Sequence, residues 1–418
     1  MSFKTRVEGA AVADGRSDKT PSNSEGMRPA SGERRGARPR RPATILMVAL
    51  AVVMLVAAGC GGGASTGGGG GSSSANLAEA QKLAKQYEAR PTAINQTKPI
   101  DKPIPTGKKI AFIGCGPASC LVYGDILKPG AEMLGWSVET IATDGSPEKL
   151  QNAIQAAVRN KADAIVLPAA DPGALGASIA DARKAGVVFV ACCSLAKAPQ
   201  LSGAEKGDDV DYNVSTPQQN GPIGDALAAK VVADSKGEAN AVYVNVSAFQ
   251  ILADVGKRFG SKYKELCPDC KLDTLEVPLT ALGKDVPDRI VSYLRSHPNV
   301  NYVVLSESGA LFPGLKGALQ AAGLGDKVKI IGRGGGDSSV YQAVGAGDIS
   351  ALVPPEQYSV DYSILDALAR KWAGVPVQAT PPNIWLTTPD TIPDTTEATF
   401  PTVENYQQQW AKLWGKSN

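Results

Sequence analysis

Short apolar runs alternate with amphipathic stretches along the chain from Lys109 to Ile331. Most of the runs are rich in Val, Ile, Leu and Ala, as are strands that are buried on both faces of a parallel sheet. The expected strands are Lys109–Gly114, Ser137–Ile141, Asp163–Pro168, Val187–Ala191, Ala241–Val246, Lys271–Val277, Tyr302–Leu305 and Lys329–Ile331. Apolar residues at helical spacing predict helices between them, among which are Gln218–Asp234, Gln250–Leu266, Pro287–Arg295 and Phe312–Ala322. Two successive blocks of strand–helix units predict an α/β fold of two doubly wound lobes.

The N-terminal segment has a different pattern. A basic stretch at 34–41 precedes an uncharged, apolar run at 43–58. This run is shorter than a comfortable membrane span and suits the core of an export signal. The run is followed by Gly59-Cys60 and a Gly/Ser-rich segment at 61–74, which predicts a flexible tether. A cytoplasmic chain with one transmembrane anchor is the alternative interpretation.

Small residues ending in Gly59-Cys60 resemble the lipobox of bacterial lipoproteins. In that family the cysteine, here Cys60, is acylated and becomes the mature N-terminus, although Ala57 stands where Leu is usual. The resemblance implies an extracytoplasmic protein that is lipid-anchored to the outer face of the cell membrane. Residues 1–59 are then a signal peptide with a long basic n-region, and 60–107 hold the tether, a short helix and a Pro-rich linker.

Charge and histidine content restrict the function. Of the 418 residues, 43 are Lys or Arg and 41 are Asp or Glu, and ten of the basic residues lie within the first 44 positions. The rest of the chain is slightly acidic and has no electrostatic reason to bind nucleic acid. The single His, His297, precedes Pro298 and fits a solvated helix end. We therefore expect no histidine-based metal cluster, and no Ser-His-Asp relay unless His297 is its base.

Two glycine-rich segments imitate nucleotide-binding motifs. Gly114-Cys-Gly116 follows a strand as in a dinucleotide-binding fingerprint, but the third Gly is absent and Pro117 removes an amide. Gly332–Gly336 lacks the Gly-Lys-Ser/Thr of a phosphate-binding loop. We expect neither an enzyme nor a bound cofactor.

Six cysteines remain besides Cys60, an even number that suits an oxidising compartment. Cys267 and Cys270 fit a small disulfide between a helix and a strand. The other four follow the first and the fourth strand and are expected to be cross-linked; they are Cys115, Cys120, Cys192 and Cys193. Their pairing cannot be derived from the sequence, and a four-cysteine zinc site is the alternative.

Several stretches together resemble the ribose/galactose-type (type I) periplasmic substrate-binding proteins of ABC importers. They occur in that family's order and are Thr143–Leu150, Asp163–Asp171, Ala185–Val190, Gly314–Gly323, Ile330–Gly332 and Val344–Ile349. The resemblance implies a clamshell whose two Rossmann-like lobes are joined by a hinge of three chain crossings, with the ligand held between the lobes.

The resemblance also gives expected domain boundaries. Lobe I comprises 108–212 plus 354–382, and lobe II comprises 213–353 plus 383–418. The crossings are expected near Asp211–Ser215, Val353–Pro355 and Thr380–Asn383.

The resemblance implies ligand-binding residues position by position. Asp171 matches an acidic residue that accepts sugar hydroxyls, or it only caps its helix. Arg258 lies where the family has a ligand-binding Arg, or it is an exposed helical Arg. Ser308 and Gly309 replace an Asn-Asp pair. The family's Gly-Phe-Asp is Gly332-Arg333-Gly334 here, so that one hydroxyl acceptor is missing.

Further candidates complete the expected site. Asp337 is a possible replacement acceptor, Gln357 replaces an expected Gln, and Tyr212 and Phe249 could stack on a ring or simply pack. The expected ligand-binding set is Asp171, Tyr212, Asn213, Phe249, Arg258, Ser308, Arg333, Asp337 and Gln357, with no metal ligand.

These features predict a monomeric solute-binding lipoprotein. We expect it to capture a small polar ligand, a sugar or sugar-like molecule, and to deliver it to an ABC permease. One alternative is a tethered sensor whose closed form engages a signalling receptor, and another is a binder of a purine or aromatic solute.

Overall fold

The computed structural model describes residues 76–115, 119–168, 172–192, 210–215, 217–246, 249–336, 338–378, 380–394 and 396–416. All of these described residues belong to one compact unit. The expected signal peptide, Cys60 and the Gly/Ser-rich tether lie outside the described residues. Within the described ranges, no helix is long and apolar enough to cross a membrane.

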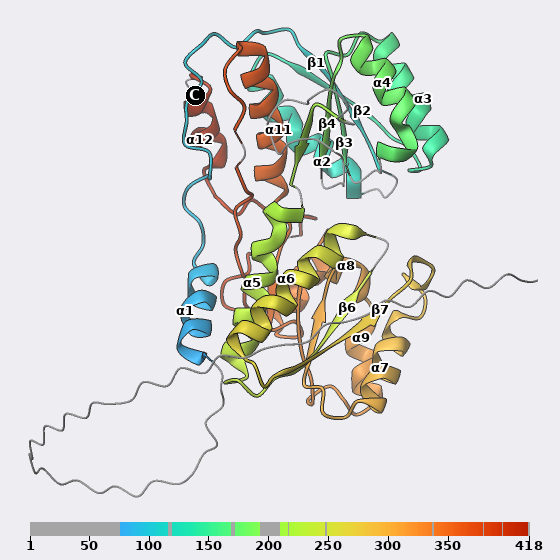
Figure 1. Cartoon of the computed structure of the whole chain (residues 1–418), viewed down its shortest axis with the longest axis vertical. Helices are drawn as coiled ribbons and strands as arrows, with labels where there is room; N and C mark the ends of the chain where they lie inside the picture. The colour runs from blue at the N-terminus through green and yellow to red at the C-terminus, as the bar shows by residue number, and fades with distance from the viewer. Residues whose placement is uncertain are drawn as a thin grey trace, which may run out of the picture. The chain divides into compact units, whose positions relative to one another are not determined.

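The first sheet has five parallel strands in the order β2-β1-β3-β4-β5. Its strands are β1 Lys109–Ile113, β2 Ser137–Ile141, β3 Ala164–Pro168, β4 Val188–Cys192 and β5 Tyr212–Val214. One face packs against α3 Pro147–Arg159, η1 Pro172–Leu175 and α4 Gly176–Lys184, and the other against α2 Ser119–Met133 and α11 Gln357–Ala373. Helices thus cover both faces of the sheet, as Figure 1 shows.

The second sheet repeats this arrangement with the strand order β10-β9-β8-β6-β7. Its strands are β6 Asn240–Asn245, β7 Lys271–Glu276, β8 Tyr302–Leu305, β9 Lys329–Arg333 and β10 Ala351–Val353. α5 Pro217–Asp234 and α6 Gln250–Leu266 cover one face. The other face packs against η2 Leu279–Ala281, α7 Val286–Ser296, α8 Ser308–Leu311, α9 Leu315–Ala321 and α10 Ser338–Gly345.

Both sheets therefore have the same doubly wound order, which confirms the predicted fold of two α/β lobes. The inner strands β3 and β4 are buried along their whole length, whereas the edge strand β7 is mostly exposed. This difference explains why the inner strands read as continuous apolar runs in the sequence.

The chain passes between the lobes near the three expected crossings. β5 belongs to the first sheet and α5 to the second, and Ser215 between them has a φ of 59°. β10 ends the second sheet, and α11 then packs in the core of the first. After α11 the chain returns to the second sheet, where Thr387 pairs with Leu352.

The C-terminal segment differs from the expected boundaries, which assigned 383–418 to lobe II. α12 Tyr406–Leu413 packs instead in the core of the first lobe. Trp414 stacks on Tyr362 of α11 with ring centroids 5.7 Å apart, and Trp410 lies beside both rings. Burial of these large aromatic side chains explains why the chain crosses once more after Phe400.

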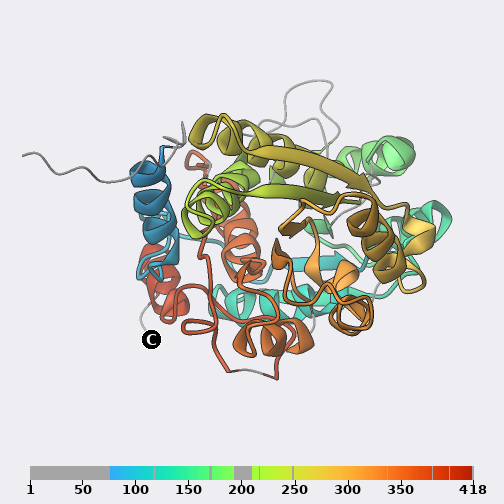
Figure 2. The same cartoon turned by 90° about the horizontal axis from the view of Figure 1, so that it is seen from below.

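A second addition is the segment Leu77–Gly107, which we call the N-terminal strap. It begins with α1 Leu77–Glu88, which lies beside α5 in both Figure 1 and Figure 2. Ala80 and Ala84 are buried in the core of the second lobe, whereas Ile94 and Ile100 are buried in the core of the first. The short helix is present as expected, but the Pro-rich part also packs against the protein, through the buried side chains of Ile94, Gln96 and Ile100.

Backbone atoms of the N-terminal strap form hydrogen bonds with α12 and with the chain that follows α11. Leu386 N donates to Tyr87 O at 2.8 Å, and Ile100 N donates to Leu413 O at 2.7 Å. The Asn383 amide donates to Ala93 O at 2.9 Å. The strap thus connects both lobes in addition to the three expected crossings.

A buried carboxylate joins the strap to the two C-terminal helices. Asp366 on α11 pairs with Arg370 at 2.7 Å, and their side chains are 4% and 3% exposed. Gln96 of the strap and Trp414 after α12 each donate to the same carboxylate at 3.0 Å. Three distant parts of the sequence therefore depend on one buried charge.

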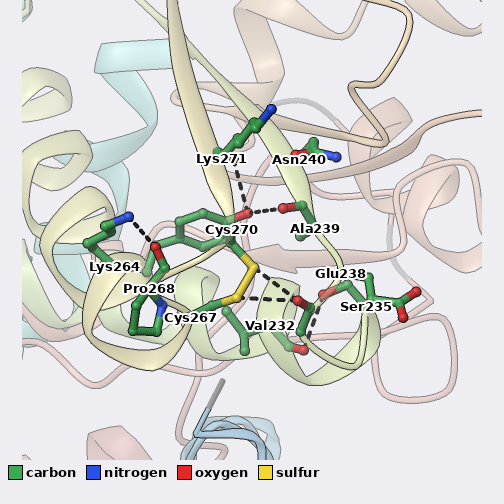
Figure 3. The surroundings of a disulfide bond; sticks show 12 residues. Val232, Ser235, Glu238, Ala239, Asn240, Lys264, Cys267, Pro268, Cys270 and Lys271 are labelled. Carbon is green, nitrogen blue, oxygen red and sulfur yellow. Dashed lines mark hydrogen bonds between the residues drawn. A yellow bond between two sulfur atoms is a disulfide. The ribbon is translucent and has the colours of Figure 1, made fainter. Parts of the chain in front are cut away.

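Two of the cysteines form a bond at the outer end of the second lobe. Cys267 and Cys270 join the end of α6 to the start of β7, with an S–S distance of 2.02 Å (Figure 3). Cys115 and Cys192 are also disulfide-bonded. The side chain of Cys120 and the whole of Cys193 lie outside the described part of the chain.

Removing the carboxylate of Asp366 should be strongly destabilising. Asp366→Ala leaves the Arg370 guanidinium buried without its partner, which costs about 3–5 kcal/mol of unfolding free energy. The control is Asp125→Ala, which removes an exposed pair with Lys128 and should cost less than about 0.5 kcal/mol. Urea unfolding measures both. A loss below about 1 kcal/mol for Asp366→Ala would contradict the role of this network.

Thiol titration tests the cysteine assignment. In a Cys60→Ser variant six cysteines remain. We expect no reactive thiol under denaturing conditions before reduction, and six afterwards, because export favours disulfides. Two or more thiols before reduction would contradict complete pairing.

Candidate functional site

Polar side chains follow the neighbouring strands β7, β6, β8 and β9 of the second sheet at their carboxyl ends. Glu276 ends β7, Asn245 ends β6, Glu307 follows β8 and Arg333 ends β9. Asn245 Nδ2 donates to both carboxylate oxygens of Glu276, at 3.1 and 3.0 Å. Since the strands are parallel, all four residues lie at one edge of the sheet, where doubly wound sheets bind ligands.

Glu307 and Arg333 form an ion pair at the centre of this edge. Arg333 Nη1 donates to Glu307 Oε2 at 2.9 Å and to Ser306 O at 3.4 Å. Gly335 N donates to Glu307 Oε1 at 3.2 Å. The Glu307 and Arg333 side chains keep 29% and 14% exposure, so a small molecule can still reach both.

Two glycines make room for the Glu307 side chain. A Cβ atom at Gly334, whose φ is +88°, would lie 1.9 Å from Glu307 Oε1. A Cβ at Gly309 would lie 2.0 Å from Gly335 O. Only glycine permits these approaches, so the loops after β8 and β9 are shaped around this carboxylate.

The environment of Glu307 has opposing electrostatic effects. Burial raises the pKa of Glu307, whereas the Arg333 charge and the amides of Gly335 and Gly309 lower it. Burial has the larger effect, so the net shift of the pKa is upward. The carboxylate therefore benefits from hydrogen-bond donors that come close to it.

Tyr123 of α2, in the first lobe, lies within range of the charges of this pair. Burial raises the pKa of Tyr123 to about 12, and the charges of Glu307 and Asp361 add to this effect while that of Arg333 opposes it. Tyr123 therefore lies within electrostatic range of the strand ends of the second lobe and of α11 of its own lobe.

Asp361 and Gln357 on α11 provide a second polar pair. Gln357 Nε2 donates to Asp361 Oδ1 at 2.7 Å, and Asp361 is 1% exposed. Burial raises the pKa of Asp361 well above its ordinary value. Asp361 Oδ2 has no hydrogen-bond partner among the described residues, and neither has the buried hydroxyl of Ser308.

The structure brings some of the predicted residues together. Ser308 and Arg333 lie beside Glu307, and a Cβ at Gly332 would be 2.4 Å from Ser308 Oγ. Gln357 lies on α11 and donates to Asp361, whose charge raises the pKa of Tyr123.

Other predicted residues have different surroundings. Arg258 on α6 forms a bidentate ion pair with Asp225 of α5, in which both N–O distances are 2.8 Å. Tyr212 and Asn213 are buried in β5, where Tyr212 belongs to the core of the first lobe. Phe249 is 44% exposed before α6.

Asp171 and Asp337 lie outside the described residues. The remaining residues of the site were missed by the sequence analysis; they are Glu307, Tyr123 and Asp361. Glu307 had a usable signal, because it is an acidic residue two positions beyond a buried strand. Tyr123 and Asp361 lie within helices, and no local pattern distinguishes them from packing residues.

The described residues contain no group of three or more His, Cys, Asp and Glu side chains arranged to hold a metal ion. The disulfides of Cys115 and Cys192 also contradict the alternative of a four-cysteine zinc site. His297 ends α7 and stacks on Tyr293, with ring centroids 3.9 Å apart. The polar groups at the strand ends suit recognition of hydroxyl and amide groups by hydrogen bonds.

Comparison with solved structures supports the architecture. An ABC sugar transporter subunit from Rhodobacter sphaeroides is 20% identical to this chain, with a TM-score of 0.54. The match covers 68% of this chain and 98% of that subunit. An ABC transporter periplasmic solute-binding protein from Actinobacillus succinogenes with bound D-allose is 18% identical over 68% and 98%, with a TM-score of 0.57. A periplasmic ribose ABC transporter from Conexibacter woesei is 16% identical, and the match covers 70% of this chain and 95% of that protein, with a TM-score of 0.57. At these identities the likeness shows the fold.

A search of curated protein sequences gives no match. The family model described as a periplasmic binding protein domain matches residues 124–375, which is more than half of the chain. These residues include the whole of α11 and every strand of the two sheets except β1. The chain therefore belongs to the periplasmic binding protein domain family and has the type I fold of that family.

Proposed function

We propose that this protein is an extracytoplasmic solute-binding lipoprotein that captures a small polar molecule and delivers it to an ABC permease. The observation that carries this proposal is the Glu307–Arg333 ion pair at the strand ends of one lobe, which lies within electrostatic range of Tyr123 of the other lobe. A molecule bound there contacts both lobes, and its contacts favour the closed arrangement. Closure then presents a new surface to the permease.

The ligand class that we propose is a sugar or a sugar-like polyol. Structures of the same fold have been solved with D-allose, α-D-tagatopyranose, allitol and 5-methylthioribose bound. All four compounds carry several hydroxyl groups. The polar strand ends of this protein offer the donors and acceptors that hydroxyl groups need.

A tethered sensor is the second candidate. One solved structure of this fold is a XylFII–LytSN complex, 16% identical to this chain with a TM-score of 0.51. The sensor differs from the importer in its protein partner and keeps the same ligand site. Ligand-dependent stimulation of a permease ATPase in proteoliposomes supports the importer, and ligand-dependent binding without that stimulation supports the sensor.

Membrane attachment depends on Cys60 in this proposal. Cys60→Ser removes the thiol that would be acylated, and the signal core alone is too short to anchor the chain well. We expect the variant in the soluble extracytoplasmic fraction and the native chain in the membrane fraction. Asp125→Ala is the control, because it changes an exposed residue of the folded part and leaves the lipobox intact. Membrane retention of Cys60→Ser would contradict the lipoprotein assignment.

A thermal-shift screen tests solute capture. The panel comprises D-ribose, D-allose, D-tagatose, allitol, adenosine, L-glutamate and L-arginine. A ligand at 100 times its dissociation constant stabilises the protein by about 2.7 kcal/mol, which moves the midpoint by several degrees. We expect a shift with at least one sugar or polyol. A shift with adenosine alone would keep solute capture and replace the ligand class.

A further inference from the structure

We infer that Glu307, held by Arg333, is the principal hydroxyl acceptor of this site, and that the ligand is an uncharged polyol with two adjacent hydroxyl groups. This inference rests on the proposed function and makes it more specific. It follows from three features of the loops after β8 and β9: the space at Gly334, the remaining hydrogen-bond capacity, and the balance of charge.

The first feature is the space at Gly334. The resemblance described above implies an acidic side chain at this position, and the chain has a glycine there. The Glu307 carboxylate lies within 1.9–2.6 Å of the point where a Cβ of residue 334 would be. A carboxylate is therefore present at this place, but it comes from the end of the neighbouring strand.

The second feature is the hydrogen-bond capacity of the pair. A carboxylate has about four acceptor positions, of which Arg333 and Gly335 occupy two here. Arg333 has five N–H donors, and its hydrogen bonds within the described structure use only Nη1. A free acceptor position and free donors thus lie next to each other. One hydroxyl can donate to Glu307 while its neighbour accepts from Arg333.

The third feature is the balance of charge. Glu307 and Arg333 form an ion pair without net charge, and burial raises the pKa of Asp361 well above its ordinary value, which favours the uncharged form of that side chain. The acidic strand-end residue Glu276 is exposed and bonded to Asn245. An anionic ligand would be repelled by Glu307 and a cationic one by Arg333. The ion pair therefore favours a molecule without net charge.

Glu307→Gln tests the acceptor while keeping the size of the side chain. Glu88→Gln is a matched control, because the Glu88–Lys230 pair has nearly the same geometry. Its N–O distance is 2.8 Å with 28% and 15% side-chain exposure, against 2.9 Å with 29% and 14% for Glu307–Arg333. Glu88 lies on α1 and has no contact with the strand ends described above.

The probes are chosen by charge. D-ribose, D-allose, D-tagatose and allitol are uncharged, D-glucuronate is an anion, D-glucosamine is a cation, and L-glutamate and adenosine represent other solute classes. Isothermal titration measures the dissociation constant of each probe for the native protein and both variants. A hydrogen bond to a charged group contributes about 1.5–3 kcal/mol, which corresponds to roughly 10- to 100-fold in affinity.

We expect the native protein to bind at least one uncharged polyol and neither charged sugar. Glu307→Gln should weaken that binding about 10- to 100-fold, while Glu88→Gln changes it less than twofold. Glu307→Asp, which withdraws the carboxylate by one methylene, should also weaken it and replaces Glu307→Gln if that variant does not fold.

Equal affinities of the Glu307 and Glu88 variants would overturn the role of Glu307. Binding of only charged sugars, L-glutamate or adenosine would overturn the ligand class and leave solute capture standing. Binding of none of the probes would overturn the inference together with the proposed function.

Discussion

The parallel direction of the strands is the constraint on which the site depends. In each sheet every strand carboxyl end points to the same edge, and the strand order places β8 and β9 next to each other. Glu307 and Arg333 are 26 positions apart in the sequence and meet because of this pairing. The glycines at 309 and 334 then allow the two loops to approach closely enough for the ion pair to form.

The two lobes are held together by more than a hinge of three crossings. Asp366 collects hydrogen bonds from the N-terminal strap, from α11 itself and from the end of α12. Glu356, at the second crossing, accepts from Ser359 at the start of α11 and from Thr402 on the returning chain. Burial raises the pKa of Glu356 to about 7, so this contact is sensitive to protonation near neutral pH.

Much of the fold could be predicted from the sequence, because buried parallel strands are apolar along their length and their helices repeat with helical spacing. The helix predicted over Gln250–Leu266 has these bounds in the structure. The position of α12 could not be predicted, since its contacts with Tyr362 join residues far apart in the sequence.

The site was predicted less completely than the fold. Ser308 and Arg333 lie at the ends of strands and were predicted as ligand-binding residues at those positions. Glu307, next to Ser308, was not predicted. Arg258 matched a motif position, but its guanidinium pairs with Asp225, which no local pattern indicates. The role of Tyr123 depends on the charges around it, and these come from three separate segments.

The N-terminal strap has a mechanical consequence for ligand capture. Because it bonds to both lobes and to the returning chain, a large displacement beside Tyr87–Ile100 would break many hydrogen bonds at once. An axis close to the strap is the one about which a rotation of the lobes would keep these hydrogen bonds. The distance travelled by a side chain then grows with its separation from that axis. Such a rotation would separate side chains far from the strap more than those beside it.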